Sequence, residues 1–273
     1  MNEIKRPMSN WLDTLADVKR VDFGDKAQFQ LKQEGIRAFI QAKGSTTARS
    51  KVASKTISLG DTLAVSARPV VNLIELKTNQ VAMADLIRDA AYQMELAELE
   101  YIQKVLNDAA EEWKDPYYAE GQGIVKSVLD PMIRHWVRMS GGQAPALFGD
   151  IEMTSKLAEQ TGFNGQFADA LIVEQNNAGV IGTYLGAKVV NLINPLKGAT
   201  DDPTFDINKL YMVPGFVDAS MRPLKVVYEG DVTSMEETHI DDQSYEVRLD
   251  QFFNAGVVVG DRPYVGVYVD TNN

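Results

Sequence analysis

Apolar residues recur every three or four positions over residues 78–115, and this spacing predicts one long amphipathic helix. Asn79 is suited to cap its start, and Pro116 to end it. Roughly 33 residues at 1.5 Å each would extend about 50 Å, more than the diameter of a small domain. We interpret the segment as a spine on which other parts of the chain, or other copies, lie; an ordinary core helix is the alternative. Its predicted apolar face is Met83, Leu86, Ile87, Ala90, Met94, Ala97, Tyr101, Val105, Ala109 and Trp113.

The segment before this helix predicts an arm and a long hairpin. Residues 1–22 read as an arm that packs on a neighbour or lies loosely, with a short helix face formed by Trp11, Leu12, Leu15 and Val18. Strand-like patterns follow at 27–31, 35–41 and 55–76, around a small, polar, basic tip at 43–55. An isolated two-stranded ribbon is marginally stable in water, so this extension needs another surface. That requirement favours oligomerisation.

Shorter elements alternate after the long helix, and their alternation predicts a compact α+β unit. Pro131 lies inside the first of these helices, so we expect a kink or break there. The strands at the end of the chain are expected to return to the long helix and close one body. The predicted helices are 121–140, 153–163 and 167–175, and the predicted strands are 145–150, 182–196, 209–217, 222–230 and those within 236–270.

Charge is divided unevenly along the chain. Residues 1–79 contain 13 lysines and arginines against 8 aspartates and glutamates, a balance of +5, and the remainder contains 14 against 30, a balance of −16, which together give −11. If the basic segment projects outward, its natural partner is the acidic body of another copy. Charge that only keeps the protein in solution is the alternative. A DNA-binding tail is disfavoured because aromatic residues do not alternate with the basic ones.

Catalytic and cofactor motifs are missing. The chain of 273 residues has no cysteine, no apolar run near 18 residues and no secretory signal pattern. Its two histidines, His135 and His239, lack neighbours at metal-ligand spacing, and no nucleophile-elbow, Walker A or dinucleotide-binding glycine motif occurs. The acidic pairs 201–202, 236–237 and 241–242 are expected in solvated loops. The sequence therefore predicts no catalytic, cofactor-binding or metal-binding residue, and favours a structural role.

Two local patterns, FGDIEMTSKLAEQ (148–160) and SYEVRLDQFFNAGVVVGDRPYVGVYVD (244–270), add to the order arm, basic hairpin, long helix, α+β unit and returning strands. This arrangement resembles the major capsid proteins of tailed bacteriophages, the Hong Kong 97 type of shell protein. The first pattern is similar to the strand-then-helix entry into that family's axial domain, and the second to its closing strands. The resemblance covers nearly the whole chain.

The resemblance implies an α+β capsid fold and self-assembly into an icosahedral shell around double-stranded DNA, with no enzymatic activity and no cofactor. The implied parts are an N-terminal arm (1–22), an extended loop (23–77), a peripheral domain (78–118 and 237–273) and an axial domain (119–236). The implied partners are copies of the chain in pentamers and hexamers, a separate scaffolding protein, a portal and DNA bound without sequence specificity, and no membrane. The protein would lie in the virion after assembly in the host cytoplasm.

Contacts between subunits are expected at the basic tip and the arm, with Lys43, Arg49, Lys51, Lys55 and Trp11 as candidates. One type of family member cross-links its subunits through a loop lysine and a peripheral-domain asparagine. Lys51 or Lys55 and Asn254 would take these roles here, without a close match to that arrangement. The alternative functions are an encapsulin-type compartment, a soluble α+β hydrolase that uses acidic residues, and a phage tail or connector component.

Overall fold

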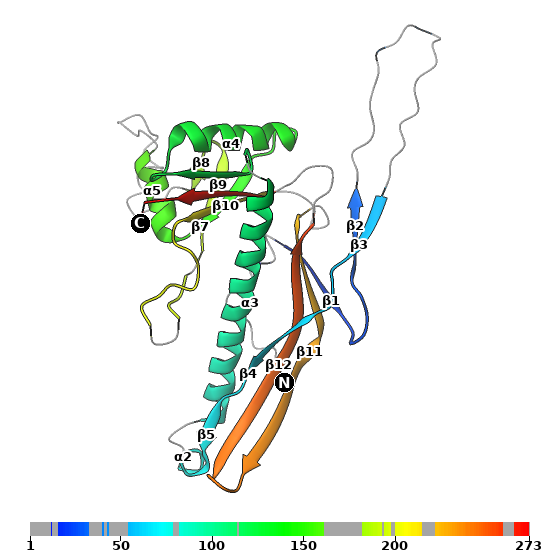
Figure 1. Cartoon of the computed structure of the whole chain (residues 1–273), viewed down its shortest axis with the longest axis vertical. Helices are drawn as coiled ribbons and strands as arrows, with labels where there is room; N and C mark the ends of the chain where they lie inside the picture. Colours follow the sequence, from blue (N-terminus) through cyan, green and yellow to red (C-terminus); the bar gives the residue numbers. More distant parts are fainter. Residues whose placement is uncertain are drawn as a thin grey trace.

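The computed structural model describes residues 12, 16–32, 40, 43, 54–78, 82–113, 115–160, 182–192, 194–197, 200–214, 222–258 and 265–272. One long helix lies between two sheets, and a ribbon of two strands projects from the body (Figure 1). The predictions for Trp11, Asn79, most of 35–41 and the helix at 167–175 concern residues outside these ranges.

The long helix α3 (Met83–Trp113) contains 31 residues and so extends about 47 Å. Its N-terminal half packs Ala90 and Met94 against Val247 and Leu249 of the first sheet. Its C-terminal half is buried between both sheets. The side chains buried there are Leu96, Leu99, Ile102, Leu106 and Ala110.

This burial corrects the predicted apolar face. Ala97 is exposed, Val105 and Ala109 are only partly buried, and their neighbours Leu96, Leu106 and Ala110 lie in the core instead. The face shifts because the helix packs on one sheet at its start and on two sheets at its end. A single stripe of regular spacing describes only a helix with one partner.

The first sheet has the order β1-β11-β12-β4, and β5 also pairs with β12. Strand β1 runs parallel to β11, whereas β12 is antiparallel to β11, β4 and β5. A short helix, α2 (Leu73–Lys77), follows β5 directly. The strands are β1 (Ala16–Val21), β4 (Leu63–Ala67), β5 (Val70–Asn72), β11 (Leu224–His239) and β12 (Ser244–Val257).

Several predictions for this part of the chain were wrong. Val18 lies in a strand paired with β11 of the same chain, not in an arm helix. Leu73 and Ile74 begin α2 where a strand was expected, because Asn72 caps a helical turn there through Ile74 N. Glu236 and Glu237 lie within β11, so they are not loop residues.

The second sheet has the order β6-β13-β10-β7-β9-β8, and its two faces pack on different helices. Leu147, Leu210 and Met212 face a core that is closed by α4 and α5. The alternate residues Phe148 and Tyr211 face α3. The elements are β6 (Tyr118–Gly121), α4 (Lys126–Met139), β7 (Pro145–Gly149), α5 (Ile151–Gln160), β8 (Thr183–Tyr184), β9 (Ala187–Asn191), β10 (Lys209–Pro214) and β13 (Gly266–Asp270).

Helix α4 continues through Pro131, so the break predicted there does not occur. Proline removes one backbone hydrogen bond, which costs about 3 kcal/mol in a helix interior. Met132, Ile133 and Trp136 are almost completely buried after it. Each such side chain contributes roughly 1.5–3 kcal/mol, which outweighs the loss.

Candidate assembly surface at the projecting ribbon

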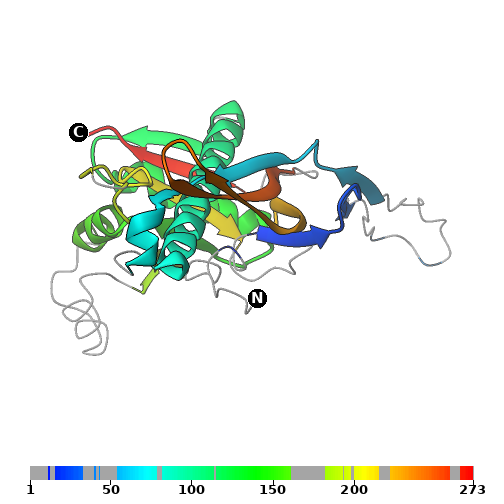
Figure 2. The same cartoon turned by 90° about the horizontal axis from the view of Figure 1, so that it is seen from below.

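The ribbon consists of β2 (Gln28–Lys32) and β3 (Ser54–Ser58), paired antiparallel. Seen from below, it lies at one side of the body (Figure 2). Phe29 lies opposite Ile57, and Leu31 lies opposite Lys55, so these four side chains share one face. Only the base of that face is covered by the chain itself: Phe29 is buried, Ile57 and Leu31 are partly buried, and Lys55 is exposed.

Two lysines hold Phe29 in place. The Nζ atoms of Lys19 and Lys225 lie 4.7 Å and 5.4 Å from the centre of its ring, within the range of cation–π attraction. Lys19 Nζ also donates to the carbonyl of Gln28 at 2.5 Å. The first residues of the ribbon are therefore fastened to β1 and β11.

Lys225 is a buried cation with a nearby counter-charge. Its side chain is 1% exposed, and its Nζ lies 3.0 Å from Oδ2 of Asp17 on the neighbouring strand. Burial is the main cause that lowers the pKa of Lys225, and the carboxylate of Asp17 opposes this. Removal of Asp17 would leave the buried charge of Lys225 without this carboxylate and would therefore be costly. The ion pair links β1 to β11 beneath the ribbon.

The ribbon root consists of residues 22–27 before β2 and 59–62 after β3, which join the ribbon to the body. Its first segment contacts Glu229 and Gly230 of β11. The carboxylate of Glu229 accepts hydrogen bonds from Thr62 Oγ1 at 2.5 Å and from the backbone N–H of Gly24 at 2.8 Å. These two bonds, that of Thr62 first, lower the pKa of Glu229. Gly230 has φ +65°, and a Cβ atom there would overlap the ring of Phe23.

The second segment of the ribbon root, residues 59–62, contacts β12. The side-chain amide of Asn254 donates to the carbonyls of Gly60 at 3.3 Å and of Asp61 at 2.9 Å. A Cβ atom at Gly256 would lie 2.8 Å from Cδ2 of Leu59, so the glycine makes room for that side chain. Both ends of the ribbon are thus fixed, while its strands extend away from the body.

Only part of the predicted contact set can be placed. Lys43 and Lys55 are exposed, and Arg49, Lys51 and Trp11 lie outside the described residues. Leu12, the neighbour of Trp11, is buried in the main core of its own chain, so this part of the arm does not lie loosely.

The root residues Glu229, Gly230, Asn254 and Gly256 were not singled out for this role by the sequence. Their partners lie far away along the chain, 205 residues in the case of Glu229 and Gly24. Glycines inside these two strands are the one sequence signal that could have indicated a close approach of another segment.

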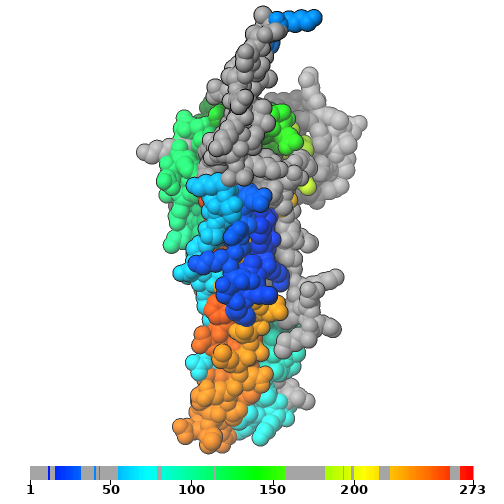
Figure 3. Space-filling view, turned by 90° about the vertical axis from the view of Figure 1, so that its right-hand side faces the viewer, coloured from blue at the N-terminus to red at the C-terminus, as the bar shows by residue number. Residues whose placement is uncertain are grey.

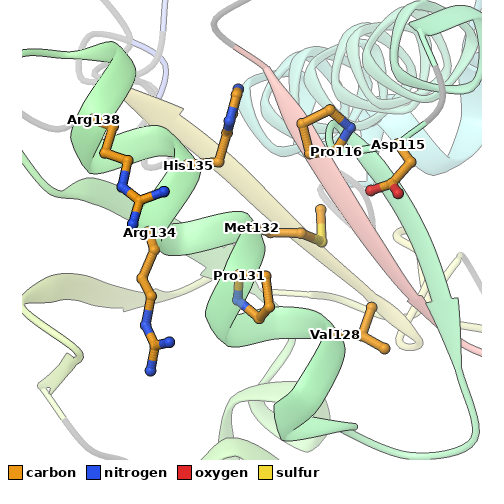
Figure 4. A pocket seen from close by; sticks show the side chains of 8 residues that line it. All are labelled: Asp115, Pro116, Val128, Pro131, Met132, Arg134, His135 and Arg138. Carbon is orange, nitrogen blue, oxygen red and sulfur yellow. The ribbon is translucent and has the colours of Figure 1, made fainter.

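A pocket of about 360 Å³ lies beside α4 (Figure 4). Arg134 and Arg138 extend along the same side of the helix, and His135 turns towards the 115–117 turn, with its ring 5.6 Å from that of Tyr117. Within the described ranges there is no group of three potential metal ligands, and no helix combines the length and apolarity needed to cross a bilayer.

Nearly the whole chain matches a known protein family. Residues 1–269 match the model of a family described as SPbeta prophage-derived putative capsid protein YonB. No curated protein matches. Among solved structures, a chain from Mycobacterium phage Che8 is 17% identical, with 92% of this chain and 86% of that chain covered and a TM-score of 0.58. The mature capsid of bacteriophage PhiM1 is 15% identical, with 95% and 86% covered and a TM-score of 0.58.

A virus-like particle from Pyrococcus furiosus is 12% identical, with 94% of this chain and 91% of that chain covered and a TM-score of 0.54. At these identities the likeness to solved structures concerns the fold. The predicted α+β fold of the phage capsid type is confirmed.

Proposed function

The chain belongs to the family of SPbeta prophage-derived putative capsid proteins, and from this we propose that it is a major capsid protein that assembles with copies of itself into an icosahedral shell. The observation that carries the proposal is the match of the family over residues 1–269. The ribbon supports it, because its base is fastened by its own body while Lys55 and one face of β2 and β3 remain available to a neighbour.

Assembly on this account results from many weak contacts repeated by symmetry. A surface ion pair contributes about 0–1 kcal/mol, too little to hold two subunits together alone. A ribbon that crosses a neighbour combines several such pairs with apolar burial, and each subunit would give one ribbon and receive one. Lys43, Arg49, Lys51 and Lys55 are the proposed contacts of the ribbon, and Trp11 that of the arm.

The proposal extends to parts and partners. We assign residues 23–77 to the extended loop, 78–118 and 237–273 to the peripheral domain and 119–236 to the axial domain. The shell would package double-stranded DNA without sequence specificity, use a separate scaffolding protein and a portal, and assemble in the host cytoplasm before it becomes part of the virion. The role is structural and not catalytic.

The experiment that tests the proposal is electron microscopy and light scattering of the purified protein, followed by nuclease digestion of particles made during infection. A capsid protein gives closed particles of megadaltons that protect DNA. A small oligomer that turns over a substrate would support the acidic-residue hydrolase instead, and rings or tubes would indicate a connector or tail component.

A cargo compartment is the alternative with the same fold. The virus-like particle from Pyrococcus furiosus shares this fold with a TM-score of 0.54, against 0.58 for the two phage chains. The family match over residues 1–269 favours the capsid over the compartment. Particles that contain a protein cargo and no protected DNA would decide for the compartment.

A further inference from the structure

The outward face of helix α4 carries only positive charge. Its exposed charged side chains are Lys126, Arg134 and Arg138, whereas its one acid, Asp130, is buried. The whole chain has a net charge of −11, and the exposed charges of the long helix α3 are mostly acidic. A face without any exposed acid therefore distinguishes α4 from the rest of this acidic protein.

Nearby acids leave these cations largely unneutralised. Asp130 accepts a hydrogen bond from the hydroxyl of Tyr184 at 2.6 Å, and its other carboxylate oxygen lies 3.9 Å from Nη2 of Arg134, which is a long ion pair. Within the described ranges, no carboxylate lies at ion-pair distance from Lys126 or Arg138. An anion from outside the chain would therefore find these side chains available.

The two arginines lie beside a recess in the surface. The pocket of about 360 Å³ is lined by the apolar side chains of Pro131 and Met132, with Arg134 and Arg138 on one side and Asp115 on the other (Figure 4). The arginines are four residues apart, so they lie about 6 Å apart along the helix axis and on the same side of the helix. Guanidinium groups bind phosphate oxygens through paired hydrogen bonds. The arginine side of the recess therefore suits a phosphate group.

The charges of α4 extend over a length that suits a continuous polyanion better than a single carboxylate. Lys126 is exposed at the start of α4, about 18 Å before Arg138 along the axis. Double-stranded DNA carries one negative charge for about every 1.7 Å of its axis, so a helix that lies on it meets several phosphates. A peptide carboxylate would occupy the arginine pair and leave Lys126 without a partner.

The outer part of the first sheet is unsuited to the same ligand. Figure 3 faces this sheet, with β11 and β12 in orange at the lower end. Residues 231–243 contain no lysine or arginine. Phosphate groups would be repelled there, so the face of α4 is the better contact for DNA. The exposed acids of this stretch are Asp231, Glu236, Glu237, Asp241 and Asp242.

We propose that the outward face of α4, with Arg134 and Arg138 at its recess, binds phosphate groups of the packaged DNA and faces the interior of the shell. Contacts with phosphates carry no sequence information, so the binding is the same for any DNA. A few such contacts per subunit are weak singly and are repeated over the shell. The inference rests on the proposed function and adds to it the surface that meets the DNA.

Binding of a short, fluorescent DNA duplex of mixed sequence to the dissociated chain tests the site. Fluorescence anisotropy is measured over a series of low salt concentrations. Arg134→Gln combined with Arg138→Gln should weaken binding and reduce the slope of log K against log salt by about 2, since each lost phosphate contact removes about 0.9. The matched control is Arg88→Gln combined with Lys104→Gln, two exposed cations of α3, which should keep the wild-type slope. Equal losses in both pairs, or a wild-type chain that does not bind the duplex, would overturn the inference.

Two competitors identify the source of the anion. Inorganic phosphate and polyglutamate are each added to the complex of wild-type chain and duplex, at the same concentration of negative charge as the duplex. The proposal predicts that neither displaces the DNA. Displacement by inorganic phosphate would show a site for the free ion, and displacement by polyglutamate would show a site for an acidic protein, and either would contradict DNA as the ligand.

A reconstruction of DNA-filled particles tests the placement of the face. We expect α4 on the inner surface, with density of the outermost DNA layer next to Arg134 and Arg138. Closed particles with α4 on the outer surface would overturn the inference and leave the capsid proposal standing. A chain that forms no particles under any assembly condition would overturn the proposed function, and the contact with packaged DNA with it.

Discussion

Single residues decide the direction in which the ribbon leaves the body. Glu229 and Asn254 each hold one end of it by hydrogen bonds to backbone groups of the two turns. Gly230 gives space to Phe23, whose ring also meets that of Phe252 edge to face at 5.8 Å. These contacts join segments that lie far apart in the chain, so the aim of the ribbon depends on the finished fold.

The role of Gly230 can be measured against a second glycine. Gly230→Ala should destabilise the protein by roughly 2–4 kcal/mol, since an L side chain at positive φ costs roughly 1–2 kcal/mol and displacement of Phe23 adds an overpacking cost. Gly24→Ala is the control, because its φ is +87° but no atom lies within 4 Å of the added Cβ. Denaturant unfolding measures both. Equal losses in the two variants would show that Phe23 does not depend on Gly230.

Acid should weaken the hydrogen bonds that Glu229 accepts from the ribbon root. The pKa of Glu229 is lowered in the folded state, so its stabilising contribution is complete above the unfolded pKa of about 4.3 and is lost as the pH falls through the lower folded value. We expect the protection factor of the Gly24 amide to fall in that acid range. Glu229→Gln should flatten this dependence. A protection factor in the wild type that does not change with pH would argue against the carboxylate as the anchor.

Among the elements, helices with one partner followed their sequence patterns. The helix predicted at 153–163 lies at Ile151–Gln160, and the apolar face of α4 around Met132, Ile133 and Trp136 was predicted, because one core covers each of them. The strand predicted at 145–150 lies at Pro145–Gly149, where both faces are buried. The face of α3 was wrong beyond Met94, since that helix changes partners along its length. The ribbon was foreseen from its basic, polar tip, but its root was not, because pairwise contacts between distant segments leave no periodic signal.

Neighbouring residues of α3 test the corrected face. Leu106→Ala should cost about 2–5 kcal/mol of unfolding free energy, the usual range for a fully buried leucine, because Leu106 is 5% exposed. Val105→Ala, one position earlier and partly buried, is the control and should cost less than about 1.5 kcal/mol. Thermal or denaturant unfolding of the isolated chain compares them. A larger loss of unfolding free energy in Val105→Ala than in Leu106→Ala would support the apolar face that the sequence predicted.

At the scale of the whole molecule, the distribution of charge and the overall shape both favour contacts between copies. The basic ribbon and the acidic β11–β12 hairpin lie apart on an elongated body (Figure 1). In the proposed assembly, such a molecule gives one surface to a neighbour and receives another, and head-to-tail contacts of this kind form rings where the rotation closes. The family match and the fold place this geometry in a capsid protein.

Charge reversal separates assembly from folding. Lys51→Glu combined with Lys55→Glu should reduce particle yield strongly, because both lysines are proposed contacts with a neighbour. The unfolding free energy of the chain should change by less than about 0.5 kcal/mol. Lys104→Glu on the exposed side of α3 is the control and should assemble normally. Particle yield by light scattering and stability by denaturant unfolding are measured in parallel. Normal particles from the double variant would count against the basic ribbon as a contact.

The most direct measurement is a cryo-electron microscopy reconstruction of the assembled particle, in which the path of residues 28–58 is traced from each subunit. We expect closed shells in which every ribbon leaves its own body and lies on a neighbour. Ribbons folded back on their own subunit, or a protein that remains a small oligomer under assembly conditions, would contradict it.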